Sequence, residues 1–248
     1  MDLGISGRTA AVSAGSAGLG FGSAKALADE GVKVAICGRD KAKLDRAVAD
    51  IGNGCVGFVC DVSTVEGARE FIAKATAALG HIDILVANGG GPKPGTFASV
   101  DLEDYQPALE RSMLATVAMC KDAIPGMQSR GWGRVVAITS SSVRQPIATL
   151  ILSNSSRAGL TSFLKTVSRE VAKDGVTVNT VQPGSHATDR IRQLYGESLE
   201  GAADGVPAGV IGDPMDFGKV VAFLCGEGAK YVTGVNLQVD GGAYGGLI

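Results

Sequence analysis

A glycine-rich segment near the N-terminus carries residue types that suit phosphate binding. The segment Ser13–Gly20 reads Ser-Ala-Gly-Ser-Ala-Gly-Leu-Gly and lies between a β-branched apolar run and a helical pattern. Glycines let backbone N–H groups approach a pyrophosphate, and the positive end of a helix dipole favours the negative charge. The spacing therefore predicts a dinucleotide-binding turn. The alternative is a tight turn that binds no ligand.

The end of the next apolar run indicates which dinucleotide would bind. An acidic residue at such a position would bind the adenine ribose hydroxyls, but here Gly38 leaves room and Arg39 follows it. The guanidinium of Arg39 can pair with a 2′-phosphate, which favours NADP(H) over NAD(H). The alternative is a solvated surface arginine. The neighbouring Asp40 either weakens the phosphate preference or caps the helix that follows.

Seven short apolar runs alternate with helical patterns and would position these residues. The runs are Thr9–Ala14, Val32–Cys37, Cys55–Cys60, Ile82–Asn88, Arg134–Thr139, Val176–Val181 and Val235–Val239. Near-continuous apolar strands separated by helices imply a parallel sheet that is covered on both faces. We expect an α/β protein with one Rossmann-type, doubly wound domain over residues 1–248 and a seven-stranded, mainly parallel sheet. The Gly-rich region near residues 185–214 interrupts the alternation and is a candidate lid over the strand ends.

The composition argues against several classes of function. The net charge of −2 gives no basic field for nucleic acid or a membrane surface, and no apolar run approaches the roughly 18 residues of a membrane span. The start, Met1–Gly4, lacks the basic and apolar parts of a signal peptide. The five cysteines show no CxxC spacing, and neither His81 nor His186 lies near a cysteine pair. We therefore expect buried free thiols, no metal site and a cytoplasmic protein.

Several motifs together resemble the short-chain dehydrogenase/reductase superfamily over essentially the full chain, and most of all its 3-oxoacyl-(acyl-carrier-protein) reductase-like branch. The glycine segment is similar to the family's Thr-Gly-x-x-x-Gly-x-Gly, with Ser13 for Thr and Ala14 for the first Gly. Further motifs that resemble the family are Asp61-Val62, Ala87–Gly90, Pro183-Gly184 with Thr188, and Tyr231–Gly242. The resemblance implies a cofactor site formed by Ser13, Gly15, Ser16, Gly18, Leu19, Gly20, Arg39, Asp61, Val62, Asn88, Gly89, Pro183, Gly184 and Thr188.

The positions of the family's catalytic Asn-Ser-Tyr-Lys tetrad depart from its pattern. The Asn position falls on Ser112, the Ser position is kept as Ser140, the Tyr position is Ser153 and the Lys position is Arg157. Serine is a far weaker acid than tyrosine, and an arginine stays protonated, so it cannot pass on a proton as lysine can. We expect these four residues to form the catalytic site, with Ser140 and Ser153 polarising a substrate oxygen and Arg157 stabilising negative charge. Ser112 is too short to replace the Asn in a chain of ordered water without help.

The residues around this site leave alternatives open. Ser153 and Arg157 lie one helical turn apart, and without the resemblance they would indicate a helix capped by Ser153 or Ser155 with a solvated arginine. His186 and Tyr195 are candidates for a replacement acid, or simply a turn residue and a lid residue. Lys93, Arg144 and Gln145 are also expected near the pocket mouth. Lys93 either meets an anionic substrate or lies in a plain loop.

The resemblance implies an NADP(H)-dependent oxidoreductase that acts on a carbonyl or alcohol substrate, with reduction of 3-oxoacyl thioesters as the family's activity. One alternative is a non-redox enzyme that uses the Arg/Ser pocket as an anion site; some relatives with Arg at the Lys position eliminate halide from halohydrins, but these keep the Tyr. Another is a non-catalytic, nucleotide-binding regulatory protein. The resemblance also implies a homotetramer, and no nucleic-acid or membrane partner is expected.

Overall fold

Seven parallel strands form one sheet in the computed structural model, which describes residues 2–189, 191–192, 196–199 and 201–247. The strands are β1 (Thr9–Val12), β2 (Lys33–Gly38), β3 (Val56–Val59), β4 (Ile84–Ala87), β5 (Gly133–Ile138), β6 (Val176–Pro183) and β7 (Asn236–Val239). Their order in the sheet is β3-β2-β1-β4-β5-β6-β7, and every pairing is parallel. The expected doubly wound sheet is confirmed. The winding reverses between β1 and β4, where such sheets open a crevice at the carboxyl ends of the strands.

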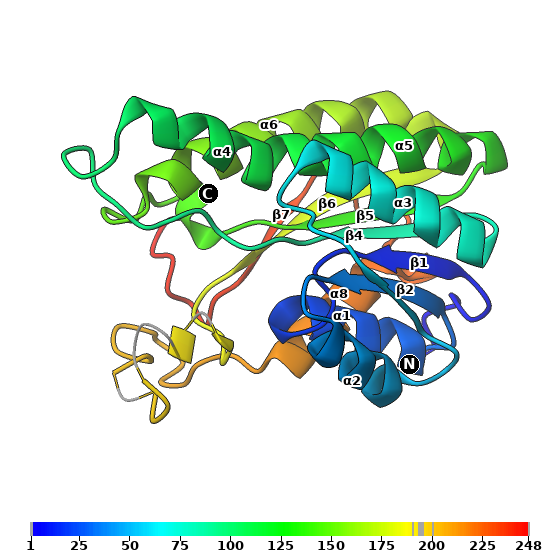
Figure 1. Ribbon diagram of the computed structural model, residues 1–248, viewed down its shortest axis with the longest axis horizontal. Coiled ribbons are helices and arrows are strands. Elements are labelled where there is room, and N and C mark those ends of the chain that lie inside the picture. The colour runs from blue at the N-terminus through cyan, green and yellow to red at the C-terminus, as the bar shows by residue number, and fades with distance from the viewer. Residues whose placement is uncertain (1, 190, 193–195, 200, 248) are drawn as a thin grey trace.

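Helices cover both faces of the sheet, as the sequence predicted. Figure 1 shows α3, α4, α5 and α6 on one face and α1, α2 and α8 on the other. Their bounds are α1 (Gly18–Asp29), α2 (Lys41–Ile51), α3 (Val65–Leu79), α4 (Tyr105–Leu109), α5 (Ala115–Arg130), α6 (Ile151–Val171) and α8 (Pro214–Cys225). A π-helix over Glu110–Leu114 joins α4 to α5. Short 3-10 turns lie at Leu102–Asp104, Ser141–Val143, Ala172–Asp174 and Glu227–Ala229.

Each face of the sheet has its own apolar core. Phe71, Met119 and Leu160 belong to the core beneath α3, α5 and α6, while Leu27 and Phe217 belong to the core beneath α1 and α8. Side chains cap the starts of α2, α3 and α8. Asp40 accepts a hydrogen bond from the N–H of Lys43 at the start of α2, which lowers the pKa of its carboxyl.

Helices α1 and α8 pack backbone against backbone. A Cβ added at Gly22 would overlap the carbonyl oxygen of Pro214, and one added at Gly218 would overlap the carbonyl oxygen of Gly22. Only glycine allows this approach. The start of α8 is therefore held directly against the helix that follows the glycine-rich turn.

The segment between β6 and α8 projects beyond the carboxyl ends of the strands, where it is drawn in yellow and orange in Figure 1. Its two ends are tied together near His186 and Gly212. The N–H of Ala187 donates to the Gly212 carbonyl at 2.9 Å, and the N–H of Gly212 donates to the Ser185 carbonyl at 2.9 Å. These bonds place the base of the segment next to the crevice.

The cysteines are confirmed as free and buried. Burial raises the pKa of Cys37, Cys55, Cys120 and Cys225 to about 12, so these thiols stay protonated at neutral pH. Among the described residues, no helix is both long and apolar enough to cross a bilayer.

Candidate functional site

The hydroxyl of Ser13 joins the ends of β1 and β4. It donates to the Asn88 carbonyl at 2.7 Å and accepts from the Asn88 N–H at 2.8 Å, and the residue is fully buried. The amide of Asn88 in turn donates to the carbonyl of Ala14 at 3.3 Å. Ser13 thus positions the glycine-rich turn against Asn88 and has no hydroxyl surface to offer a ligand.

The turn itself has no space for larger side chains. A Cβ at Gly20 would overlap the Ala14 carbonyl oxygen and lie 2.7 Å from Nδ2 of Asn88, and one at Gly15 would lie 2.8 Å from Cγ2 of Ile36. Ala14 has a φ of 47°, in the left-handed region that costs a non-glycine residue roughly 1 kcal/mol. Ala14 stands where the family carries glycine, so the chain keeps the conformation of the turn at the cost of this strain.

The start of α1 is open to an anionic group. Its N-cap residue, Ala17, makes no side-chain cap hydrogen bond, and the first turn contains no acidic residue. The first backbone N–H groups of a helix need acceptors, and the helix dipole favours a negative one. This end of α1 therefore fits the pyrophosphate that the glycine pattern predicted.

The end of β2 differs in one respect from the sequence prediction. The space left by Gly38 is taken by the chain itself, because a Cβ at Gly38 would lie 2.5 Å from Oγ of Ser16. Gly38 thus admits the Ser16 side chain instead of leaving room for a ligand. Arg39 is exposed beyond it. Partial burial acts to raise the pKa of the Asp61 carboxyl, but hydrogen bonds from Ser63 and the charges of Arg39 and Arg111 lower it overall.

The Pro183-Gly184 turn also closes toward the glycine-rich turn. The N–H of Gly184 donates to the Val239 carbonyl at 2.9 Å, which continues the pairing of β6 with β7. Thr188 lies beside Gly18, because a Cβ at Gly18 would come within 3.2 Å of the Thr188 methyl group. The structure thus brings together the glycine-rich turn, Asn88 and Thr188, although they are far apart in the sequence.

Arg157 is not the solvated residue of a capped helix start. Helix α6 begins at Ile151, so Ser153 and Ser155 lie inside its first turns and do not cap it. The Nη1 atom of Arg157 donates to the carbonyls of Ile138 and Thr139, each at 3.0 Å. Burial lowers the pKa of Arg157 to about 10, and the guanidinium therefore remains charged at neutral pH. The alternative in which Ser153 or Ser155 caps the helix is wrong.

Ser140 directly follows the two carbonyls that Arg157 binds. Its Oγ accepts a hydrogen bond from the N–H of Ser142 at 3.1 Å, and the residue is half-buried. A hydroxyl that accepts one bond can still donate its own hydrogen to a ligand. Arg157 thus holds the strand end that presents Ser140, while Ser153 is buried on the same helix as Arg157.

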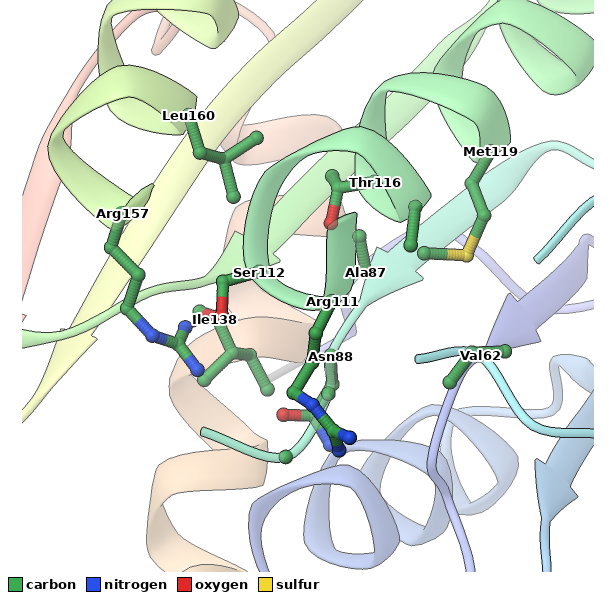
Figure 2. Close-up of a pocket in the computed structure, with 13 residues that line it drawn as sticks. Val62, Ala87, Asn88, Arg111, Ser112, Thr116, Met119, Ile138, Arg157 and Leu160 are labelled. Carbon is green, nitrogen blue, oxygen red and sulfur yellow. Dashed lines mark hydrogen bonds between the residues drawn. The ribbon is translucent and has the colours of Figure 1, made fainter. Parts of the chain in front are cut away.

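A narrow pocket lies between α5 and α6 at the carboxyl end of β4 (Figure 2). Its polar lining includes Asn88, Arg111, Ser112 and Arg157, and its volume of about 10 Å³ is near the lower limit for one ordered water. Neither Ser140 nor Ser153 is among the described residues that line it. The Oγ of Ser112 is buried and has no hydrogen-bond partner among the described residues.

The sequence analysis did not identify Arg111 or the π-helix that carries it. Residues Glu110–Leu114 continue the helical pattern of their neighbours, and one wider turn leaves no mark in hydrophobic spacing. Such single wide turns inside helices are frequent at functional sites. Figure 2 shows that Ser112 and Arg111, on this turn, both point into the pocket.

The candidates for a replacement acid and for the pocket mouth have other partners. His186 is buried, its Nδ1 lies 3.1 Å from the Gly184 carbonyl, and its ring meets Phe217 edge-on at 5.0 Å. Burial lowers the pKa of His186, so the ring is neutral at neutral pH. Lys93 pairs with Asp104 at 2.6 Å. Arg144 donates to the Asn236 carbonyl at 3.4 Å, and the N–H of Gln145 donates to the Ser141 carbonyl. Tyr195 lies outside the described residues.

The chain is similar to known proteins over nearly its whole length. The sequence profile of a family described as Enoyl-(Acyl carrier protein) reductase matches residues 13–244. The chain is 31% identical over 242 residues to 3-oxoacyl-(acyl-carrier-protein) reductase of Vibrio cholerae, covering 98% of this chain and 99% of the relative. The chain belongs to the short-chain dehydrogenase/reductase family. Another relative is human dehydrogenase/reductase SDR family member 4, which is 32% identical over 244 residues and is matched over 96% of this chain and 88% of its own length.

Solved structures of short-chain reductases share the fold over nearly the full chain. L-sorbose reductase of Gluconobacter frateurii, in complex with NADPH and L-sorbose, superposes with a TM-score of 0.92 at 28% identity and full coverage of both chains. YwfH, an NADPH-dependent reductase of bacilysin biosynthesis, superposes with a TM-score of 0.92 at 27% identity over 97% of this chain and 99% of its own. The chain is thus a member of a family of oxidoreductases whose solved members include NADPH enzymes.

Proposed function

We propose that the protein is an NADP(H)-dependent reductase of a carbonyl substrate, with 3-oxoacyl thioesters as the substrate class. One observation carries the proposal: the uncapped start of α1, Asn88 and Thr188 surround a glycine-rich turn at the switch point of the sheet. The full-length similarity to 3-oxoacyl-(acyl-carrier-protein) reductases supports the substrate class. The NADPH complex of L-sorbose reductase supports the cofactor.

Different residues around the turn would bind different parts of the cofactor. The backbone from Gly15 to Gly20 would hold the pyrophosphate, and Arg39 would pair with the 2′-phosphate. Asp61-Val62 would contact the adenine, and Asn88-Gly89 the adjoining ribose. Pro183-Gly184 with Thr188 would hold the nicotinamide end. When bound, the reduced nicotinamide supplies the hydride of the reaction.

The chain's own residues would bind and orient the carbonyl. Ser140 retains a hydrogen to donate to the substrate oxygen, and Ser153 adds a second hydroxyl on α6. Arg157 would favour negative charge on that oxygen through its field and through its hold on the strand end before Ser140. None of these groups is a good acid at neutral pH. Loss of general acid catalysis typically lowers a rate by about 10²- to 10⁴-fold, so we expect a slow reductase.

Titration of nucleotide fluorescence tests the cofactor part of the proposal. NADPH should bind more tightly than NADH, and Arg39→Gln should remove most of that preference while leaving NADH affinity unchanged. Lys33→Gln is a matched control, because Lys33 is also exposed but lies at the start of β2, whereas Arg39 directly follows the end of this strand. Equal affinity of the wild-type protein for the two nucleotides would contradict the preference.

A non-catalytic, nucleotide-binding regulator is the second candidate. The changes at Ser112, Ser153 and Arg157 favour it, because they remove the family's acid and its proton relay. Tight NADPH binding without turnover of 3-oxoacyl thioesters or simple ketones would identify the regulator. Slow but NADPH-dependent turnover would identify the reductase.

The proposal extends to the setting of the enzyme. We place it in the cytoplasm, as one domain over residues 1–248 with residues 185–214 acting as a lid, and as a homotetramer. The protonated, buried thiols fit a reducing compartment. Leu109 and Leu114, both exposed beside α5, fit a subunit interface at that helix. Light scattering of the purified protein tests the assembly.

A further inference from the structure

Arg111 is a cation on the pocket wall whose side chain has no direct bonding partner among the described residues. It is half-buried on the π-helix, and its guanidinium faces the pocket at the carboxyl end of β4 (Figure 2). Among the described residues, it makes no salt bridge and no side-chain hydrogen bond. The adjacent carboxylate of Glu110 is engaged elsewhere, because it accepts a hydrogen bond from the N–H of Val65 at 3.2 Å.

The backbone opposite Arg111 is bare. A Cβ at Gly90 would lie 3.9 Å from Nη1 of Arg111, and Gly91 has no atom within 4 Å of its Cβ position. The guanidinium therefore looks across an open stretch of glycine backbone at the edge of the sheet where open α/β folds bind ligands.

Two further observations indicate that a polar ligand completes the contacts near this point. The Oγ of Ser112, the next residue, is buried without a partner in the described part of the chain. Arg157, a second cation on the pocket wall, binds two neutral carbonyls and no carboxylate of the described residues. Buried polar groups are nearly always hydrogen-bonded, and cations near a crevice attract anions.

The neighbours of Arg111 indicate which anionic group it would bind. Asn88 lines the same pocket as Arg111 and also donates to the Ala14 carbonyl, so it links this pocket to the glycine-rich turn. Arg39 extends from the end of β2, a different strand, and is exposed there. The charges of both arginines help to lower the pKa of the Asp61 carboxyl, and Val62, the next residue, lines the same pocket as Arg111.

We propose that Arg111 binds the pyrophosphate segment that NADPH and NADH share, as a second cation beside the one that Arg39 offers to the 2′-phosphate. The inference rests on the proposed dinucleotide site and adds to it a residue outside the family's motifs. A guanidinium presents paired donors that match phosphate oxygens. Arg111 thus sets affinity for both nucleotides, and Arg39 sets the choice between them.

Binding measurements on Arg111→Gln separate the two roles. Loss of one charge-assisted hydrogen bond typically weakens binding about tenfold. The affinities for NADPH, NADH and ADP-ribose should therefore all fall by about this factor, while the ratio of NADPH to NADH affinity stays unchanged. Arg39→Gln should weaken NADPH alone. Arg169→Gln makes the same charge change on the exposed face of α6 and should change none of the three affinities.

The outcomes distinguish this inference from the proposed function. If wild-type protein binds both nucleotides and Arg111→Gln leaves every affinity within twofold, the role of Arg111 is overturned and the dinucleotide site stands. If Arg111→Gln weakens NADPH alone, Arg111 contacts the 2′-phosphate and the inference is again overturned. If wild-type protein binds no dinucleotide, both fail. Arg111→Lys, which keeps the charge, should recover part of the affinity, and thermal unfolding of each variant checks that it is folded.

Discussion

The glycine-rich turn and the start of α6 both depart from the family's motifs, but with opposite results. At the turn, Ser13 stands for Thr and still bonds Asn88 through its hydroxyl, and Ala14 stands for Gly and still adopts the left-handed conformation. At α6, Ser153 stands for Tyr and Arg157 for Lys, and Arg157 now binds backbone carbonyls. The first region keeps its geometry, whereas the second changes its chemistry.

The difference shows what each region needs from its side chains. Binding a pyrophosphate depends on backbone N–H groups, so any residue that keeps the backbone conformation serves. Proton transfer depends on a functional group of a suitable pKa, and neither a serine hydroxyl nor a guanidinium supplies one near neutral pH. Two substitutions therefore leave the conformation of the turn intact, whereas two substitutions at α6 remove the groups that transfer a proton in the family's motif.

Restoring the family's residues at α6 should have the largest effect. Ser153→Tyr with Arg157→Lys adds an acid and a lysine next to it, and we expect NADPH-dependent reduction of a simple ketone to rise by about 10²-fold or more. Ser153→Phe with Arg157→Lys is the matched control, because it adds the ring without the hydroxyl. If the folded tyrosine variant is no faster than this control, the pocket does not serve hydride transfer.

A substitution in the glycine-rich turn tests the opposite side of the comparison. In Gly20→Ala, the new methyl group would overlap the Ala14 carbonyl and press on Asn88, and we expect a loss of about 1–3 kcal/mol in the free energy of unfolding with a parallel loss of NADPH affinity. Urea denaturation and nucleotide titration measure the two effects. Gly228→Ala has no atom within 4 Å of the added methyl group and should change neither. Normal stability and affinity of Gly20→Ala would mean that the turn is less tightly packed than described.

Removal of Arg157 should affect stability more modestly. Arg157→Met leaves the carbonyls of Ile138 and Thr139 without their donor, and it also removes a buried cation, so the two effects partly offset each other. We expect the free energy of unfolding to fall by about 1 kcal/mol. Arg169→Met, on the exposed side of the same helix, controls for the loss of an arginine. A more stable Arg157→Met protein would show that the two hydrogen bonds stabilise the fold by less than burial of the guanidinium charge destabilises it.

The smallest expected effect is a change in the pH dependence of stability at His186, which lies at the base of the segment between β6 and α8. Because burial lowers the pKa of His186 in the folded protein, the unfolded chain binds its proton first as the pH falls through about 6.5. Stability from neutral His186 is therefore present above this pH and is lost below it. The free energy of unfolding should fall less steeply between pH 7 and 5 in His186→Gln than in wild-type protein. Identical slopes would contradict a buried, neutral His186.

The sequence was sufficient for the fold and for the location of the crevice. Short apolar runs predicted all seven strands. The five inner strands are buried on both faces and so need nearly continuous apolar residues, whereas the edge strands β3 and β7 are only partly buried. The strand ends then placed Asn88 and the glycine-rich turn at one edge, although Ser13, Asn88 and Thr188 are far apart in the chain. Their meeting follows from the order of the strands.

Features that depend on one side chain's direction could not be predicted. The space at Gly38 is taken by Ser16, which becomes evident only when β2 and the turn are placed together. The bonds of Arg157 to β5 depend on the register between α6 and the sheet. Arg111 was missed because a single π-turn redirects it without altering the apolar pattern around it.

The glycine contact between α1 and α8 has a consequence for the order of folding. The two helices lie near opposite ends of the chain, and the backbone of α1 at Gly22 packs directly on Pro214 and Gly218. Closing so long a loop is slow, because its entropy is lost before the contact can compensate. During synthesis the first βα unit emerges early, but its helix finds its partner only after residue 225 has left the ribosome. The helix that follows the glycine-rich turn therefore reaches its final packing only when the C-terminal part of the chain is in place.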